Sequence, residues 1–483
     1  MPGRPPRSFR PRFARRTQRP RQSPHGRSAG HPSTAAGRAP LCRLARTGQF
    51  RYSFSSRRAF ATNSTGRQQQ RQARRSVTAA GTGALCGRRI LELADPSGAY
   101  CGKLLADMGA DVIKIERVGG DPARRIPPLW RNEASEDTSF AFLYTNTSKR
   151  GITLNLEPPA GRDLFLQLVR KADVVIETFE PGYLNALGVG YEALARLNSR
   201  IVLTSITAFG QTGPQCHYRS SDLVASALGG ALYVIGEEND PPVTLAGSQA
   251  HVSASTFAAS SSLVALLHAS RTGRGQHVDV SIQEAVTAVT HICGVGKWLD
   301  DGIIPKRRGT SLFASVPSGA YPCKDGLVYL MVNRPLHWKA LADWIHEETG
   351  NEEVLDPMFE GPSSRRQEHR ELIDLFICEL TQRFTVSEVY HEGQRRHIAF
   401  TPVNSAAAVA RDPQLEARAY FVSLAHPEGG HLRYPGAPYR HSRTPWSLRG
   451  SAPGVGEHNE EVYRGELGLS AEQLGALRDH GVI

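Results

Sequence analysis

Residues 88–116 read RRILELADPSGAYCGKLLADMGADVIKIE, and this stretch predicts a βαβ unit. The apolar run at its start is typical of a short buried strand. In AYCGKLLADMG, Leu104, Leu105 and Met108 fall on one face of a helix, and Gly109 ends that helix. The run ADVIKIE predicts a second strand. Strand, helix and strand in such a short span imply a parallel sheet and an α/β fold.

The alternation of helix and strand continues over residues 161–209, and a long helix of small residues is expected at 253–270. The Pro- and Gly-containing segment 179–190 is predicted to be a loop after the carboxyl end of a strand, where ligands bind in open α/β sheets. We therefore predict a first, Rossmann-like domain over residues 86–305. A hairpin pattern followed by amphipathic helices predicts a smaller α+β domain at 306–420. Residues 421–483 return to strands and end in a helix.

The net charge of +12 is concentrated near the N-terminus. Residues 1–91 contain 21 Arg and no Lys, Asp or Glu, so the remainder carries −9. We expect residues 1–80 to be disordered, and an Arg- and Ser-rich, acid-poor N-terminus is typical of a mitochondrial transit peptide. We predict import into the matrix, with cleavage after Phe60. A nucleic-acid-binding tail or a wrongly assigned start codon would have a similar composition, but the acidic remainder lacks the basic face of a nucleic-acid-binding protein.

The cysteines and the hydropathy pattern restrict the class of protein further. The seven cysteines are far apart and form no CxxC pair, which favours free thiols in a reducing compartment and no metal site. No apolar run approaches the roughly 18 to 20 residues needed to cross a bilayer, so no membrane partner is expected.

Several motifs occur in an order that resembles CoA-transferase family III, the CaiB/BaiF family. They include LLADMGADVIKIE, NTSKRGITLNL at residues 146–156, SITAFGQTGP at 205–214 and TGRGQHVDVSIQEA at 272–285. The resemblance covers about residues 88–483. It implies an interlocked homodimer in which both ends of each chain build the large domain, so 421–483 would return to that domain. It also implies acyl-CoA and carboxylic acids as substrates, with coenzyme A present as the substrate thioester.

The resemblance also suggests residues that bind CoA. Arg117 matches an arginine near the nucleotide, and a guanidinium suits phosphate oxygens. Arg150 and Leu154 match residues that line the CoA groove. Thr178 and Phe179 match an Asn-Phe pair of the family, so the amide is replaced while the aromatic ring stays. Glu157 stands where the family has a lysine.

The catalytic position departs from the family. Relatives use an aspartate that attacks the acyl-CoA carbonyl to form a mixed anhydride. An ungapped count back from TGRGQ puts His251 on that position, and no Asp or Glu lies between Asp240 and Asp279. His251 could act as nucleophile or general base, and Asp222 could supply the missing carboxylate. For Asp222, helix capping is an equally good explanation.

We therefore predict a CoA-transferase that moves CoA between an acyl-CoA thioester and a carboxylic acid, with His251 and Asp222 as the catalytic candidates. Two alternatives stay open. One is proton transfer, as in the racemase branch, or lyase or hydrolase chemistry on acyl-CoA with His251 as base. The other is a protein that binds acyl-CoA without catalysis.

Overall fold

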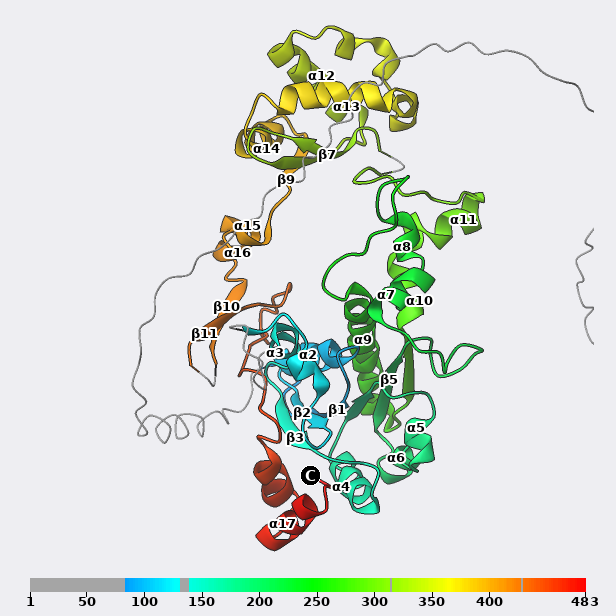
Figure 1. Ribbon diagram of the computed structural model, residues 1–483, viewed down its shortest axis with the longest axis vertical. Helices are drawn as coiled ribbons and strands as arrows, with labels where there is room; N and C mark the ends of the chain where they lie inside the picture. Colours follow the sequence, from blue (N-terminus) through cyan, green and yellow to red (C-terminus); the bar gives the residue numbers. More distant parts are fainter. Residues whose placement is uncertain (1–82, 131–138, 313–314, 427–428) are drawn as a thin grey trace, which may run out of the picture. The chain divides into compact units, whose positions relative to one another are not determined.

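The structure is a computed structural model that describes residues 83–130, 139–312, 315–426 and 429–483. The predicted transit region, 1–80, lies outside the described residues. The largest sheet has six strands, all parallel, in the order β3-β2-β1-β4-β5-β6 (Figure 1). This is the doubly wound order of a Rossmann sheet, and it confirms the predicted fold class. The strands are β1 (Arg89–Leu93), β2 (Asp111–Glu116), β3 (Arg150–Thr153), β4 (Val174–Glu177), β5 (Val202–Thr207) and β6 (His277–Ser281).

Both faces of this sheet are buried, because successive strand residues point to opposite sides. Ile90 of β1 belongs to a core with α2 (Ala99–Asp107) and α9 (Gln249–Thr272). The next residue, Leu91, belongs to a second core with α4 (Pro159–Val169), α6 (Tyr191–Leu197) and α17 (Ala471–Asp479). The C-terminal helix thus packs in the same core as residues from the first half of the chain.

The predicted βαβ unit is confirmed in β1, α2 and β2. Leu105 is buried, with Leu104 and Met108 packed against the same core, and Gly109 follows the helix with φ +105°. The loop expected at 179–190 is partly wrong, since it contains the short helix α5 (Tyr183–Ala186). The other α-helices are α3 (Phe140–Thr145), α7 (Asp222–Leu228), α8 (Ala231–Val234), α10 (Ile282–Val289), α11 (Val295–Asp301), α15 (Ala406–Val409) and α16 (Pro413–Ala417).

The TGRGQ segment is the turn between α9 and β6. Gly273 ends α9 in the left-handed region, with φ +74°. Gly275 lies directly against the residue that precedes β5, because a Cβ there would be 1.8 Å from the carbonyl oxygen of Ile201. Only glycine fits such a close approach of two backbones.

Helix α9 corrects the expectation that no apolar segment is long enough to cross a membrane. Its 24 residues reach that length, with a mean hydropathy of 1.3 over an 18-residue window. The sequence pattern was misleading because alanines and serines separate the larger side chains. Of that window, 44% is buried inside the protein, where α9 packs on α2, β5 and β6.

A second sheet is antiparallel and has a core of its own. It contains β7 (Ser318–Pro322), β8 (Leu327–Met331) and β9 (Ala399–Pro402), and its core includes α12 (Pro335–Thr349), α13 (Arg370–Thr381) and α14 (Val386–Arg395). The predicted hairpin and the helices after it are therefore confirmed. The domain boundaries near residues 305 and 420 stay predictions.

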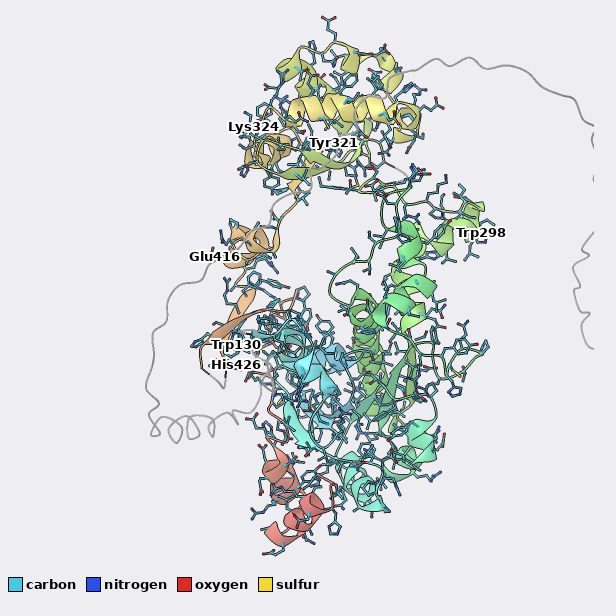
Figure 2. The ribbon with its side chains drawn as sticks, in the orientation of Figure 1. Trp130, Trp298, Tyr321, Lys324, Glu416 and His426 are labelled. Atoms are coloured by element: carbon cyan, nitrogen blue, oxygen red, sulfur yellow. The ribbon has the colours of Figure 1, made fainter. Side chains whose placement is uncertain are left out.

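The predicted strands after residue 420 form the hairpin of β10 (Phe421–Ala425) and β11 (His431–Pro435). The His426 ring, just after β10, lies 4.2 Å from the ring of Trp130 (Figure 2). The five cysteines whose side chains the structure describes are all free thiols, as predicted: Cys86, Cys101, Cys216, Cys323 and Cys378.

Candidate active site

The candidate site lies at the carboxyl edge of the parallel sheet, where the strand order changes direction between β1 and β4. Such a switch point leaves a crevice between the two loops that follow the strands. Here the loop after β1 holds Asp95, and the loop after β4 holds Thr178 and Phe179. The Asp95 backbone N–H donates to Thr178 Oγ1 at 2.9 Å, so the two loops are joined directly.

A cavity of about 230 Å³ opens at this edge. Three of the residues predicted to bind CoA line it, namely Arg117, Leu154 and Phe179. The Arg117 side chain is exposed and Leu154 is buried, while the Phe179 ring packs on Tyr183 with centroids 4.7 Å apart. The cavity therefore combines an exposed cation with an apolar and aromatic wall.

Arg150 lies elsewhere. It is the first residue of β3, at the amino edge of the sheet, whereas Leu154 follows the carboxyl end of the same strand. Its guanidinium binds Asp111 at 2.6 Å, Glu466 at 2.6 Å and Glu461 at 2.9 Å. The structure does not bring Arg150 together with the other predicted CoA residues, because parallel strands separate their two ends.

His251 sits in the first turn of α9, three positions after Ser248. Ser248 has φ +53° and its side chain caps nothing. Instead, Asp222 from α7 supplies the acceptor: its Oδ1 accepts the His251 backbone N–H at 3.1 Å. Ser221 caps α7 itself by accepting the Val224 N–H. Asp222 is thus a cap, as the sequence allowed, but it caps the neighbouring helix.

The surroundings of His251 favour the uncharged form of its ring. Burial lowers the pKa of His251 below its usual value, and the carboxylates of Asp222 and Asp95 oppose that shift without cancelling it. Within the described part of the chain, no hydrogen bond engages the imidazole ring. An uncharged imidazole can act as a nucleophile or a base.

Asp95 is a site residue that the sequence analysis missed. It lines the cavity and also acts electrostatically on His251, so it links the two halves of the site. Its position, on the first loop after β1 of a doubly wound sheet, was a usable signal.

A buried ionic network contacts the backbone on both sides of Asp95, in the loop after β1. Lys149 Nζ binds Glu92 at 2.7 Å and the Ala99 carbonyl oxygen at 2.8 Å. Lys114 Nζ donates to the carbonyl oxygen of Ala94 at 2.9 Å, next to Asp95. The side chains of Lys149, Glu92 and Lys114 are all at most 1% exposed, so this network is buried.

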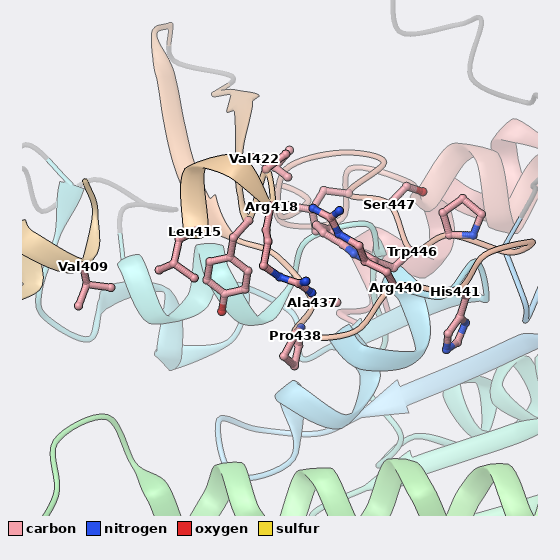
Figure 3. Close-up of a pocket in the computed structure, with 14 residues that line it drawn as sticks. Val409, Leu415, Arg418, Val422, Ala437, Pro438, Arg440, His441, Trp446 and Ser447 are labelled. Carbon is pink, nitrogen blue, oxygen red and sulfur yellow. The ribbon is translucent and has the colours of Figure 1, made fainter. Parts of the chain in front are cut away.

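A larger cavity, of about 870 Å³, lies beside β10 and α16. Figure 3 shows the basic and aromatic side chains that line it, among them Arg418, Arg440, His441 and Trp446. None of the predicted site residues lines this cavity. Among the described residues, no group of three or more His, Cys, Asp or Glu side chains is suited to hold a metal ion.

The comparisons with known proteins decide the family. The profile of CoA-transferase family III matches residues 85–459. The chain belongs to this family. It is 36% identical over 405 residues to succinyl-CoA:(R)-benzylsuccinate CoA-transferase subunit BbsE of Thauera aromatica, covering 82% of the chain and 97% of that protein. It is 32% identical to formyl-CoA:oxalate CoA-transferase of Streptomyces avermitilis, covering 83% of the chain and all of that protein.

Solved structures agree with the sequence relatives. A CaiB/BaiF family protein from Brucella suis superposes with a TM-score of 0.69 at 29% identity, over 80% of the chain and 99% of that structure. The family III CoA-transferase described here is therefore an enzyme that moves CoA between a thioester and a carboxylic acid.

Proposed function

We propose that this CoA-transferase carries out its reaction at the junction of the β1 loop, the β4 loop and the first turn of α9. The observation that carries the proposal is the cavity at the carboxyl edge, where Arg117, Leu154 and Phe179 meet the Asp95 loop that approaches His251. Arg117 would face the phosphates of CoA, and Phe179 would pack on its apolar portion. Arg150 would support β3 rather than contact CoA, because its guanidinium is held by three carboxylates.

His251 and Asp222 have different roles in this proposal. His251 lies beside the reacting thioester with its imidazole in the uncharged form. Asp222 holds the first turn of α9 through the His251 backbone N–H, and so fixes where the imidazole lies. Asp222 is thus a positioning residue.

The acyl group in this proposal is a short dicarboxylate of the succinyl type. The Thauera relative and two further relatives, from Chloroflexus aurantiacus and Agrobacterium fabrum, have succinyl-CoA or succinate in their names. A second carboxylate needs a cation, and the cluster at residues 306–308 supplies Lys and Arg side chains. Lys306 pairs with Glu238 at 2.9 Å at an exposed site, a pairing weak enough for a substrate carboxylate to replace.

Transfer of isotope-labelled succinate into succinyl-CoA by the purified full chain tests the activity, with formate and oxalate as competing acids. His251→Gln is expected to reduce the rate strongly. His268→Gln is the matched control, because His268 is exposed on the same helix. Exchange with none of these acids would contradict the proposed function. Equal rates for His251→Gln and wild type would contradict the role of His251.

The proposal includes a homodimer. Of the 28 large hydrophobic side chains exposed among the described residues, 17 fall between Tyr218 and Ile304. They include Phe257, Val264 and Leu267 on the outer side of α9 and Trp298 of α11, which is 53% exposed (Figure 2). A helix that is apolar on two sides requires a cover on both, and exposed apolar surface of this extent marks an interface. Light scattering on the purified chain should give twice the chain mass.

A second candidate is an assembly with a different chain of the same family. Two points support it: the predicted match of His251 to the family's aspartate position, and the name of the Thauera relative, which is one subunit of its enzyme. In that case the purified chain would bind CoA but exchange no acids until the second chain is added.

We also propose that the protein acts in the mitochondrial matrix. The support is the composition of residues 1–91, with 21 Arg and no acidic residue. A fluorescent protein fused after Ile483 should colocalise with a matrix marker, and replacing the Arg residues of 1–60 by Gln should abolish that. Cytosolic fluorescence from the unaltered chain would contradict the proposal.

A further inference from the structure

Three carboxylates line the cavity at the carboxyl edge, and two of them are already paired. Glu116 holds Arg124 in a bidentate ion pair, with contacts of 2.5 and 2.8 Å. Asp121 lies 3.2 Å from Lys114 Nζ and accepts the Ala123 N–H. Asp95 is the third, and in the described part of the chain it has no cationic partner.

The bonds that Asp95 makes leave one oxygen available. Its Oδ1 accepts both the N–H and the hydroxyl of Ser97, and no hydrogen bond to Oδ2 occurs among the described residues. The side chain is exposed to the cavity. A carboxylate that is fixed through one oxygen and unpaired at the other can act as a nucleophile.

The loop that carries Asp95 approaches the face of α9 that carries His251. Ser255 Oγ donates to the carbonyl oxygen of Ser97 at 3.1 Å. Ser255 follows His251 by four residues, so both side chains lie on the same face of α9, one turn apart. Burial favours the uncharged form of the His251 ring, so the ring is a poor cationic partner for a nearby carboxylate.

The other acids near His251 fit the task less well. The stretch between Asp240 and Asp279 has no carboxylate, so α9 cannot supply one. Asp222 uses Oδ1 to cap α9, and it does not line the cavity.

We propose that Asp95 is the carboxylate that receives the acyl group in this transferase. This inference rests on the proposed function, and it replaces the family's carboxylate on α9 with one on the loop after β1. Asp95 is then a catalytic residue, with His251 beside it.

The steps balance without any further reactant. Asp95 Oδ2 attacks the thioester carbonyl, the C–S bond breaks, and CoA thiolate leaves a mixed anhydride behind. The thiolate attacks the Asp95 carbonyl, releases the first carboxylate, and leaves Asp95 as a CoA thioester. The incoming carboxylate displaces the thiolate, forming a new anhydride. Attack of the thiolate on the acyl carbonyl of that anhydride gives the product thioester and restores the Asp95 carboxylate.

Hydroxylamine trapping tests the assignment on the full chain. The protein is mixed with succinyl-CoA and hydroxylamine, digested, and mapped by mass spectrometry. An anhydride or thioester on Asp95 is converted to a hydroxamate at that residue, which is the expected result. Asp95→Asn keeps the acceptor for Ser97 and should lower the exchange of labelled succinate by about 10³-fold, with CoA binding within about threefold of wild type.

Two further variants control for folding and for chance modification. Asp95→Glu keeps a carboxylate, so it should fold, exchange slowly, and form its hydroxamate on the new side chain. Asp163→Asn changes an exposed aspartate on α4 and should leave exchange and labelling unchanged. A hydroxamate on Asp222, or an Asp95→Asn variant with more than a tenth of the wild-type rate, would overturn the inference while the proposed function stands. Wild-type protein without any exchange would overturn both.

Discussion

The cap that Asp222 places on α9 gives a prediction that joins stability to activity. Asp222→Ala removes the only side-chain acceptor that the described residues offer to the His251 N–H, because Ser248 caps nothing. Loss of a helix cap costs about 1 kcal/mol, and loss of a negative charge at a helix N-terminus costs up to about 1 kcal/mol more. We expect the first turn of α9 to be destabilised by about 2 kcal/mol in total.

Hydrogen exchange followed by mass spectrometry measures the loss of stability in the first turn of α9 separately from the rest of the protein. For peptides that cover residues 248–256, about 2 kcal/mol corresponds to roughly 30-fold faster exchange in Asp222→Ala. Asp222→Asn keeps the acceptor oxygen and loses only the charge, so its exchange should accelerate by no more than about fivefold. Ser221→Ala is the comparison for loss of the neighbouring cap, since Ser221 Oγ accepts the Val224 N–H of α7.

The same two variants separate positioning from chemistry. The Asp222 carboxylate raises the pKa of His251, so removing its charge lowers that pKa further. The acid limb of the pH–rate profile should therefore move to lower pH in Asp222→Asn, with little change in the maximal rate. Equal hydrogen-exchange rates for Asp222→Asn and Asp222→Ala would refute the capping argument. A loss of rate by Asp222→Asn as large as that of Asp95→Asn would refute the positioning role.

Other perturbations follow from the core and the sheet edge. Lys149→Met leaves the Glu92 carboxylate buried without its closest cation, so it should lower the free energy of urea unfolding by about 3 to 5 kcal/mol. The double variant with Glu92→Met should recover most of that stability. A Lys149→Met protein as stable as wild type would contradict this argument. Burial raises the pKa of Glu177 to about 7, whereas the same group in the unfolded chain titrates near 4.5. Between these two pH values the folded state holds a proton that the unfolded state has lost, so the free energy of unfolding decreases as pH rises through the folded pKa. Relative to wild type, Glu177→Gln should therefore gain about 3 kcal/mol between pH 4 and pH 8, and a pH-independent difference would contradict the assignment. Gly275→Ala should cost about 3 kcal/mol in thermal unfolding, since its Cβ would be 1.8 Å from the Ile201 carbonyl oxygen; an unchanged melting temperature would show that the turn relaxes freely.

The local pattern of apolar residues was sufficient to predict most strands of the large sheet. The runs RILEL and DVIKIE are rich in Ile, Leu and Val and are buried on both faces, and that composition predicts parallel strands. The family motifs predicted the class of reaction, because each motif is a contiguous stretch of sequence that can be recognised without the structure. The length of α9 was predicted less well, because its small residues weaken the hydropathy signal at both ends.

The sequence by itself determined the α/β class, the family and the absence of a carboxylate at position 251, since each depends on residue types at known spacing. Which residues meet in space was decided only by the tertiary structure. Arg150 and Leu154 are four residues apart, yet a parallel strand carries them to opposite edges of the sheet. Asp222 and Asp95 lie far from His251 along the chain, and both reach it because α7 and the loop after β1 converge on the first turn of α9. Contacts of this kind depend on the order of the strands, which no local pattern encodes.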